Sequence, residues 1–288
     1  MAANIPGQQL PAGLYFIATP IGAARDITLR ALDILRTADV IAAEDTRSLR
    51  HLMDIHGIAL GDRPLLSYHD HNGERVRPRI LSALAEGRSV AYASEAGTPL
   101  VADPGYQLGA AAIAAGHVVT AAPGPSAVLA ALTVSGLPSD RFLFAGFAPN
   151  AGGQRRRWLE EIGGIPATLI LYESPKRINA LLRDMESVFG TERRIAVCRE
   201  LTKKFEEVTR GSIAEVVAAF DGRVVKGEIV VLVDRARGVA AAEADIEVAL
   251  REALTCQSVK DAAASVAELT GAPKREVYQL ALKLAGGN

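Results

Sequence analysis

Short apolar segments that end in loops rich in glycine and proline recur along this chain. The clearest case is SEAGTPLVADPG at 94–105, which follows an apolar run at 88–93 and precedes an alanine-rich run at 106–115. Its two glycines permit positive φ and close backbone approach, and its two prolines stiffen the loop. A strand, an irregular loop and a helix in this order are typical of open α/β sheets, in which ligands bind beyond the carboxyl ends of the strands.

Three further loops of this kind follow apolar runs: TPIG at 19–22, PGPSA at 123–127 and, less clearly, GFAP at 146–149. The alternation of strand-like and helical runs predicts an α/β fold with a mostly parallel sheet. None of the loops matches GxGxxG or GxxxxGK[ST], so a nucleotide phosphate is not the predicted ligand. Small side chains leave the backbone accessible, which suits a ligand such as adenosine carrying an amino-acid tail.

Composition narrows the class of protein. The 288 residues are 49% hydrophobic and 23% charged with a formal net charge of −1, so the chain is not a generic polyanion binder. The two cysteines, Cys198 and Cys256, have no metal-ligand spacing, which argues against zinc and disulfides. The N-terminus lacks a signal-peptide pattern, and no apolar run approaches the length of a membrane span. We therefore expect a cytoplasmic protein.

The pattern along the chain predicts four parts. Residues 1–12 are expected to form a flexible tail, 13–125 an N-terminal α/β domain, 126–238 a second α/β domain, and 239–288 a small helical domain. The last part resembles a helix-turn-helix, although an αα-hairpin without a binding role has the same signature. It carries more acidic than basic residues, which weakens an electrostatic role in RNA binding.

Eight motifs occur in the order and spacing of the tetrapyrrole methylase superfamily. They are TPIGAARDIT at 19–28, AEDTR at 43–47, SEAGTPLVADPG at 94–105, PGPSA at 123–127, FAGFAP at 144–149, YESPKR at 172–177, CRELTK at 198–203 and KGEIVVLV at 226–233. More narrowly, the chain resembles the ribosomal branch of that superfamily, which methylates the ribose 2′-hydroxyl of a cytidine in small-subunit rRNA. Each motif alone is weak, but eight in register are specific.

This resemblance implies two α/β domains with S-adenosyl-L-methionine in the cleft between them, a homodimer, and the RNA of the small ribosomal subunit rather than DNA as the partner. The cofactor supplies an activated methyl group, and the protein supplies positioning and electrostatics. Carried over by position, the implied cofactor contacts are Pro20, Glu95, Ala96, Gly97, Thr98, Val101, Ser126, Ala127, Tyr172, Glu173 and Leu201.

A ribose hydroxyl is a poor nucleophile, so a general base or a cation would help its attack. Charged residues at strand ends are the candidates: Glu44, Asp45 and Arg47 after one strand, and Glu200 and Lys203 after another. The alternative is that these are structural ion pairs or RNA-positioning groups. His69 and His71 invite a metal interpretation, but without a further ligand no metal is predicted.

The run Arg155-Arg156-Arg157 beside Trp158 is expected to be a flexible, basic loop that clamps RNA phosphate, with Lys204 adding a contact. The alternative is the start of a helix with Trp158 in the core. The chain departs from the family pattern twice, with Glu95 in place of Asp and with KKFEE where a histidine is usual near Phe205. Two rival functions stay open: a corrin- or porphyrin-precursor C-methyltransferase, and a non-catalytic ribosome assembly factor.

Overall fold

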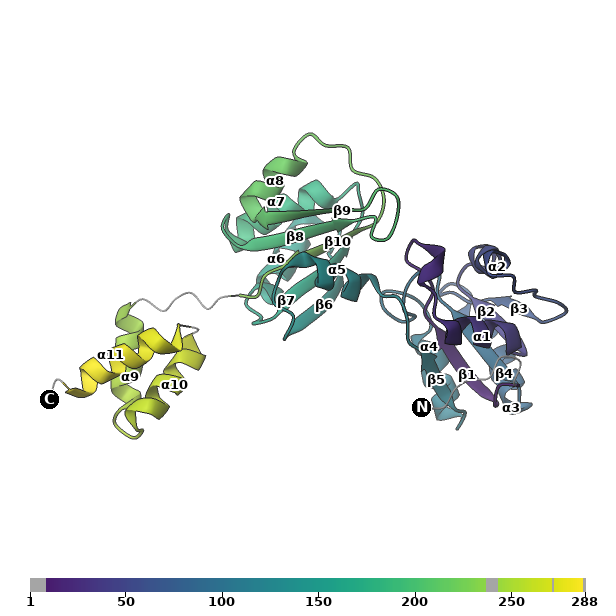
Figure 1. Cartoon of the computed structure of the whole chain (residues 1–288), viewed down its shortest axis with the longest axis horizontal. Helices are drawn as coiled ribbons and strands as arrows, with labels where there is room; N and C mark the ends of the chain where they lie inside the picture. Colours follow the sequence, from purple (N-terminus) through teal and green to yellow (C-terminus); the bar gives the residue numbers. More distant parts are fainter. Residues whose placement is uncertain (1–8, 237–242, 271, 287–288) are drawn as a thin grey trace.

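The computed structural model describes residues 9–236, 243–270 and 272–286, as two α/β domains followed by a helical domain (Figure 1). Most of the predicted flexible tail, 1–12, and part of the expected segment between the second and third domains lie outside the described residues. The α/β class predicted from the sequence is confirmed.

The first domain has a five-stranded sheet of order β3-β2-β4-β1-β5 in which every pairing is parallel, as predicted. Its strands are β1 (Gly13–Ile17), β2 (Val40–Ala43), β3 (Leu65–Ser67), β4 (Ser89–Ala93) and β5 (Val119–Ala122). Its helices are α1 (Leu29–Thr37), α2 (Thr46–Ile55), α3 (Gly73–Ala85) and α4 (Tyr106–Ala114), after a short 3₁₀ turn, Ala24–Asp26. The three interior strands β2, β4 and β1 are buried throughout, as expected for strands covered on both faces.

Helices cover both faces of this sheet. Residues of α1 and α2, including Leu35 and Met53, pack on one face, and residues of α3 and α4, including Ile80 and Leu108, pack on the other. Local capping explains where two helices begin: the Thr28 side chain accepts a hydrogen bond from the Ala31 N–H, and Asp45 accepts from the first turn of α2. Because every strand of this sheet runs in the same direction, the loops that follow the strands all lie at the same edge.

The second domain has a sheet of order β6-β7-β10-β8-β9. Here only β6 and β7 pair in parallel, whereas β10 runs antiparallel to β7 and β8, and β8 to β9. The strands are β6 (Phe142–Phe147), β7 (Thr168–Glu173), β8 (Arg194–Arg199), β9 (Glu207–Ser212) and β10 (Ile229–Val233), and the helices are α5 (Ala127–Ser135), α6 (Gly152–Gly163), α7 (Ile178–Phe189) and α8 (Ile213–Phe220).

The alternation of side chains along β10 divides the core of this domain. Ile229, Val231 and Val233 pack with α6, α7 and α8, whereas Val230 and Leu232 pack with α5 on the opposite face. Helix α5 thus covers the face of the second sheet that turns toward the first domain. The TPIG loop meets this face, because Ile21 belongs to the same buried cluster.

The C-terminal part folds as α9 (Glu243–Ala253), α10 (Val259–Thr270) and α11 (Lys274–Gly286). The three helices share a small core that includes Leu250, Val266 and Val277. In the described part of the chain, no helix is both long and apolar enough to cross a membrane.

One local prediction is wrong. The expected flexible loop at 152–157 is the first half of α6, and Trp158 is partly buried against the core of the second domain. Leu159 and Ile162 supply buried positions on the same helix. The alternative interpretation of this basic run, a helix start with the tryptophan in the core, is the correct one.

Candidate functional site

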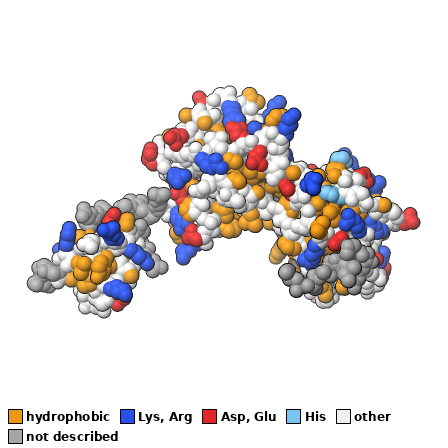
Figure 2. Space-filling model, in the orientation of Figure 1, with side chains coloured by type: hydrophobic (Ala, Val, Ile, Leu, Met, Phe, Trp, Pro, Cys, Tyr) orange, Lys and Arg blue, Asp and Glu red, His pale blue; other side chains and the backbone are white. Residues whose placement is uncertain are grey.

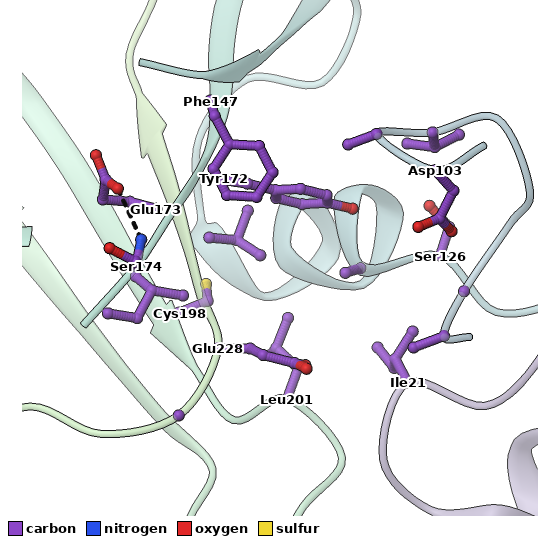
Figure 3. A pocket seen from close by; sticks show the side chains of 18 of the residues that line it. Ile21, Asp103, Ser126, Phe147, Tyr172, Glu173, Ser174, Cys198, Leu201 and Glu228 are labelled. Atoms are coloured by element: carbon purple, nitrogen blue, oxygen red, sulfur yellow. Dashed lines mark hydrogen bonds between the residues drawn. The ribbon is translucent and has the colours of Figure 1, made fainter. Parts of the chain in front are cut away.

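A cavity of about 440 Å³ lies between the two α/β domains (Figure 3). The loop after β4 and the TPIG loop form one side, and the ends of β6, β7, β8 and β10 form the other. The lining residues are Ile21, Glu95, Ala96, Gly97, Thr98, Val101, Ala102, Asp103, Ser126, Ala127, Phe147, Tyr172, Glu173, Ser174, Pro175, Cys198, Leu201, Gly227, Glu228, Ile229 and Val230. Its size is that of a site for a ligand as large as a nucleoside with a side arm.

The structure brings together almost all of the residues implied for the cofactor. Glu95, Ala96, Gly97, Thr98, Val101, Ser126, Ala127, Tyr172, Glu173 and Leu201 all line the cavity. Pro20 does not, although its neighbour Ile21 does. In the TPIG loop it is Ile21 that reaches the cavity and the buried cluster of the second domain.

Gly97 holds the loop after β4 in place. Its N–H donates to the Thr19 carbonyl and its carbonyl accepts from the Thr19 N–H, both at 2.9 Å. The residue has φ +82°, and a Cβ there would lie 3.4 Å from Ile21 Cγ2. The expectation that the Gly97 backbone itself contacts a ligand is therefore modified: both of its polar groups are already bonded, and Gly97 shapes the loop that presents Ala96 and Thr98.

Backbone strain is concentrated in the two loops beside the cavity. Among the described residues, the non-glycine residues with positive φ are Leu100 and Ala102 in the loop after β4, and Glu200 and Thr202 in the loop after β8. Such conformations are costly and persist where the surrounding structure fixes them, commonly at functional sites. Their position on both sides of one cavity makes this cavity the candidate functional site.

The TPIG loop of the first domain and the loop after β8 of the second are joined by a hydrogen bond. The N–H of Ala23, just after the TPIG loop, donates to Thr202 Oγ1 at 3.0 Å. Gly22 lies so close to this loop that a Cβ would approach Thr202 Oγ1 to 2.5 Å. Glycine is therefore required there for the domains to meet.

The N-terminus of α5 opens into the cavity. Ser126 occupies the N-cap position but its side chain makes no capping hydrogen bond, and both Ser126 and Ala127 line the cavity. The first N–H groups of a helix have no partner within the helix, so this end suits an acceptor group of a ligand. Apolar side chains, including Val101, Phe147 and Leu201, form the neighbouring walls.

Hydrophobic side chains are also exposed around the cavity. In Figure 2 they gather on the side of the second domain that turns toward the first, whereas charged side chains are dispersed over the outer surfaces. Phe147 at the cavity is 55% exposed, and its ring lies 5.7 Å from that of Tyr172. Flat apolar rings of this kind suit a nucleobase.

Asp103 is the unusual charged group of the cavity. Burial, and next the negative charges of Glu44 and Glu95, raise the pKa of the Asp103 carboxyl to about 7. The pKa of Glu44 is itself raised, by burial and by the charge of Glu95. Figure 3 shows the Tyr172 hydroxyl pointing across the cavity toward the side on which Asp103 lies. Burial and then the charge of Asp103 raise the pKa of Tyr172 to about 12.

Two of the predicted catalytic residues, Glu200 and Lys203, lie behind the cavity wall and not in it. Lys203 Nζ is 3.0 Å from both Glu200 Oε1 and Glu228 Oε2, and the Glu228 N–H donates to Glu200 Oε1 at 2.9 Å. That backbone hydrogen bond is the main cause of the lowered pKa of Glu200. Burial lowers the pKa of Lys203, but hydrogen bonds to both carboxylates outweigh it and raise the pKa. This arrangement corresponds to the alternative of a structural ion pair.

The other predicted pair, Asp45 and Arg47, also fits its structural alternative. Asp45 Oδ1 accepts from the Arg47 N–H at 2.7 Å and caps α2, and the Arg47 side chain is 92% exposed. Neither residue lines the cavity. Hydrogen bonds from the Arg47 side chain and backbone lower the pKa of Asp45.

The predicted RNA contacts differ in accessibility. Arg155 is 7% exposed, and its Nε donates to Asp184 Oδ2 at 2.6 Å, so the prediction that it binds phosphate is corrected. Arg156 is exposed but also contacts Asp184. Arg157 and Lys204 are exposed, and Lys204 Nζ lies 5.6 Å from the centre of the Phe205 ring.

Several cavity residues were missed by the sequence reasoning. Asp103, Ala102 and Phe147 lie within motifs already noted, so the signal was present but not used. Cys198 and Val230 also lie within noted motifs, CRELTK and KGEIVVLV, but only the sheet order brings β8 and β10 to the cavity, so their place in its wall could not be predicted from the motifs. Within the described residues, no cluster of three or more His, Cys, Asp or Glu side chains could hold a metal ion.

The sequence matches two known families. Residues 13–217 match the family described as Tetrapyrrole (Corrin/Porphyrin) Methylases, and residues 240–285 match the RsmI C-terminal HTH domain. The chain is 48% identical to the "Ribosomal RNA small subunit methyltransferase I" of Mesorhizobium japonicum, over 98% of this chain and 95% of that protein. It is 46% identical to the protein of the same name from Xylella fastidiosa strain Temecula1, over 93% of this chain and 98% of that protein.

Solved structures support the same fold. The uroporphyrin-III-C-methyltransferase of Thermus thermophilus superposes with a TM-score of 0.55 at 21% identity, covering 77% of this chain and 94% of that one. At this identity the likeness concerns the fold.

Proposed function

This chain belongs to the tetrapyrrole (corrin/porphyrin) methylase family, and we propose that it transfers a methyl group from S-adenosyl-L-methionine to the ribose 2′-hydroxyl of a cytidine in the RNA of the small ribosomal subunit. The relatives named for small-subunit rRNA methylation support the substrate class, since the chain spans 95% and 98% of the length of two of them. The proposed enzyme acts in the cytoplasm, as a homodimer.

The cavity between the domains is the observation that carries this proposal. Its walls combine small and apolar residues with four carboxyl groups, it has no phosphate-binding loop, and the uncapped N-terminus of α5 opens into it. These features fit an adenosine that carries an amino-acid tail. Ala96, Thr98 and Ser126 are proposed to hold its polar groups, and the walls formed by Val101, Leu201 and Tyr172 its apolar parts.

The bound cofactor supplies a methyl group on a positively charged sulfur. The residues of this chain then have three tasks: to hold the acceptor hydroxyl in line with that methyl group, to exclude water, and to take up the hydroxyl proton. The apolar walls of the cavity serve the second task, because they reduce competing hydrolysis.

Arg157 and Lys204 are the proposed phosphate contacts, since both are exposed. Arg157→Ala and Lys204→Ala are each expected to weaken RNA binding to a similar extent for all RNA sequences. Each is also expected to reduce the slope of log binding constant against log salt concentration by about 1. Arg155→Ala is not a suitable substitution for this purpose, because it would leave Asp184 without its buried partner.

The proposal is tested by incubating the protein with methyl-labelled S-adenosyl-L-methionine and one of three acceptors: undermethylated small subunits, naked rRNA, or a tetrapyrrole precursor. Nuclease digestion and mass spectrometry then locate the methyl group. We expect label on a ribose in subunit RNA. Label on the tetrapyrrole alone would contradict the proposal.

Calorimetry with the cofactor alone separates an enzyme from a non-catalytic assembly factor. Saturable binding at one site per chain is expected. No binding, together with retained affinity for the subunit, would indicate the assembly factor instead. Light scattering tests the proposed homodimer.

A further inference from the structure

We infer that Asp103 accepts the proton of the ribose hydroxyl during methyl transfer, which makes it a catalytic residue. This inference rests on the proposed function and deepens it. Asp103 lies in the loop after β4, lines the cavity and was not among the catalytic residues expected from the sequence.

The other titratable groups that line the cavity are poorly suited to this task. Glu173 accepts from the Ser174 N–H at 2.7 Å and lies 3.1 Å from Arg177, and Glu228 is paired with Lys203. Burial raises the pKa of Cys198 to about 12, as it does that of Tyr172, so both are protonated at neutral pH and do not serve as bases. Glu95 and Asp103 are the carboxyls left.

Asp103 differs from Glu95 in its surroundings. Asp103 is half-buried, whereas Glu95 is exposed to solvent. In the described part of the chain, no cation or hydrogen-bond donor is recorded on the Asp103 carboxyl. It directly follows Ala102, whose φ is +58°. A strained backbone that holds an unpaired, half-buried carboxyl at a cavity wall is the arrangement expected of a reacting group and not of a structural one.

The charge around Asp103 favours proton uptake. The groups that face it are the carboxyls of Glu44 and Glu95 and the phenols of Tyr92 and Tyr172. Each carboxyl adds negative charge, and neither phenol is ionised at neutral pH. A base whose pKa lies near the working pH combines a useful fraction of the ionised form with a strong tendency to take the proton.

The ribose oxygen forms a bond to the methyl carbon, and the bond between that carbon and sulfur breaks, with its electron pair left on sulfur. The hydroxyl proton moves to a carboxylate oxygen of Asp103. Asp103 then returns the proton to solvent when the products leave.

The test compares Asp103→Asn, which keeps the shape but cannot accept the proton, with Asp103→Glu, which keeps the acid. Asp62→Asn is the matched control, because Asp62 is an exposed residue of the same domain. Single-turnover rates on small subunits are measured from pH 5.5 to 9, and cofactor affinity is measured by calorimetry. The wild-type rate is expected to rise with pH and level off above an apparent pKa near the value of about 7 found for Asp103.

We expect Asp103→Asn to bind the cofactor within a few-fold of wild type and to lose at least about 100-fold in rate, with the rise with pH abolished. Asp103→Glu should recover part of the rate and keep a rise with pH. A wild-type rate in Asp103→Asn would overturn the inference, and so would loss of cofactor binding with an unchanged pH profile, which would make Asp103 a cofactor ligand.

A second variant and the wild-type protein keep the possible outcomes distinct. If Asp103→Asn does not fold, an unchanged rate and pH profile in Asp103→Glu overturn the inference, because the added methylene must displace a reacting carboxylate. Failure of the proposed function is seen separately, as wild-type protein that binds cofactor but does not methylate subunits.

Discussion

The loops that follow β4 and β8 border the same cavity and are both strained, yet their charges are arranged in opposite ways. After β8, Lys203 stands between Glu200 and Glu228 and is paired with both. After β4, Glu95 and Asp103 lie near Glu44, and among the described residues none of these three carboxyls forms an ion pair, although His69 lies near enough to Glu44 to lower its pKa slightly. The paired loop joins the two domains, whereas the unpaired loop keeps a carboxyl ready to exchange a proton.

The role of a charged residue at a strand end therefore depends on the partners of its side chain. Paired charges stabilise the fold, and removing one partner leaves the others without compensation. Carboxyls that repel one another destabilise the fold, which is a cost expected at a site shaped by function.

Gly97→Val should have the largest effect and tests whether the loop after β4 forms the cofactor site. Valine at φ +82° would also place its side chain against Ile21, so we expect cofactor affinity to fall at least about 100-fold, because the loop must move. Gly57→Val is the matched control: it has φ +63° but nothing within 4 Å of its Cβ. Calorimetry on both variants decides, and normal binding by Gly97→Val would place the site elsewhere.

Lys203→Met tests the paired loop. It leaves Glu200 and Glu228 without their shared cation, so the free energy of unfolding is expected to fall by about 1–3 kcal/mol. Urea denaturation measures this, with the exposed neighbour Lys204→Met as the control. Equal stability of the two variants would show that the ion pairs contribute nothing.

Asp103→Asn should raise the free energy of unfolding at alkaline pH, whereas Lys203→Met should lower it. The folded-state pKa of about 7 exceeds the usual value of 3.8, so between these values the folded chain binds more protons, and the free energy of unfolding falls as pH rises. Asp103→Asn carries no ionisable group at this position, so its free energy of unfolding does not fall with pH in this way. We expect it to be more stable than wild type by on the order of 1–2 kcal/mol at pH 8 and to match it near pH 4. A variant that is less stable at pH 8 would mean that the Asp103 charge is stabilised in the fold.

Glu44→Gln should have the smallest effect. Removing its negative charge lowers the pKa of Asp103, so the rise of the single-turnover rate with pH should move to lower pH by about one unit. Glu86→Gln, a change at an exposed residue at the end of α3, should leave the profile in place. An unmoved profile in Glu44→Gln would show that Asp103 and Glu44 do not interact.

Much of the site could be predicted from the sequence because its loops depend on local chemistry. Glycine and proline specify where strands end and turns begin, which is why the loop at 94–105 and the Ser126–Ala127 step were found. Which charged side chains form ion pairs could not be predicted in this way. Lys203 reaches Glu228, and Arg155 reaches Asp184, across tens of residues and between different elements. For the same reason the sequence does not single out Asp103 within its motif, because some of the residues that surround its carboxyl come from other elements.

The position of β10 has a consequence for synthesis of the chain. This strand is the last of the second domain in sequence, yet it lies at the centre of the sheet, between β7 and β8. Until residue 233 has left the ribosome, β7 and β8 have no common neighbour, and the cavity lacks the wall formed by residues 227–230. The first domain can fold early, but the ability to bind a cofactor arises only after the whole second domain has been made.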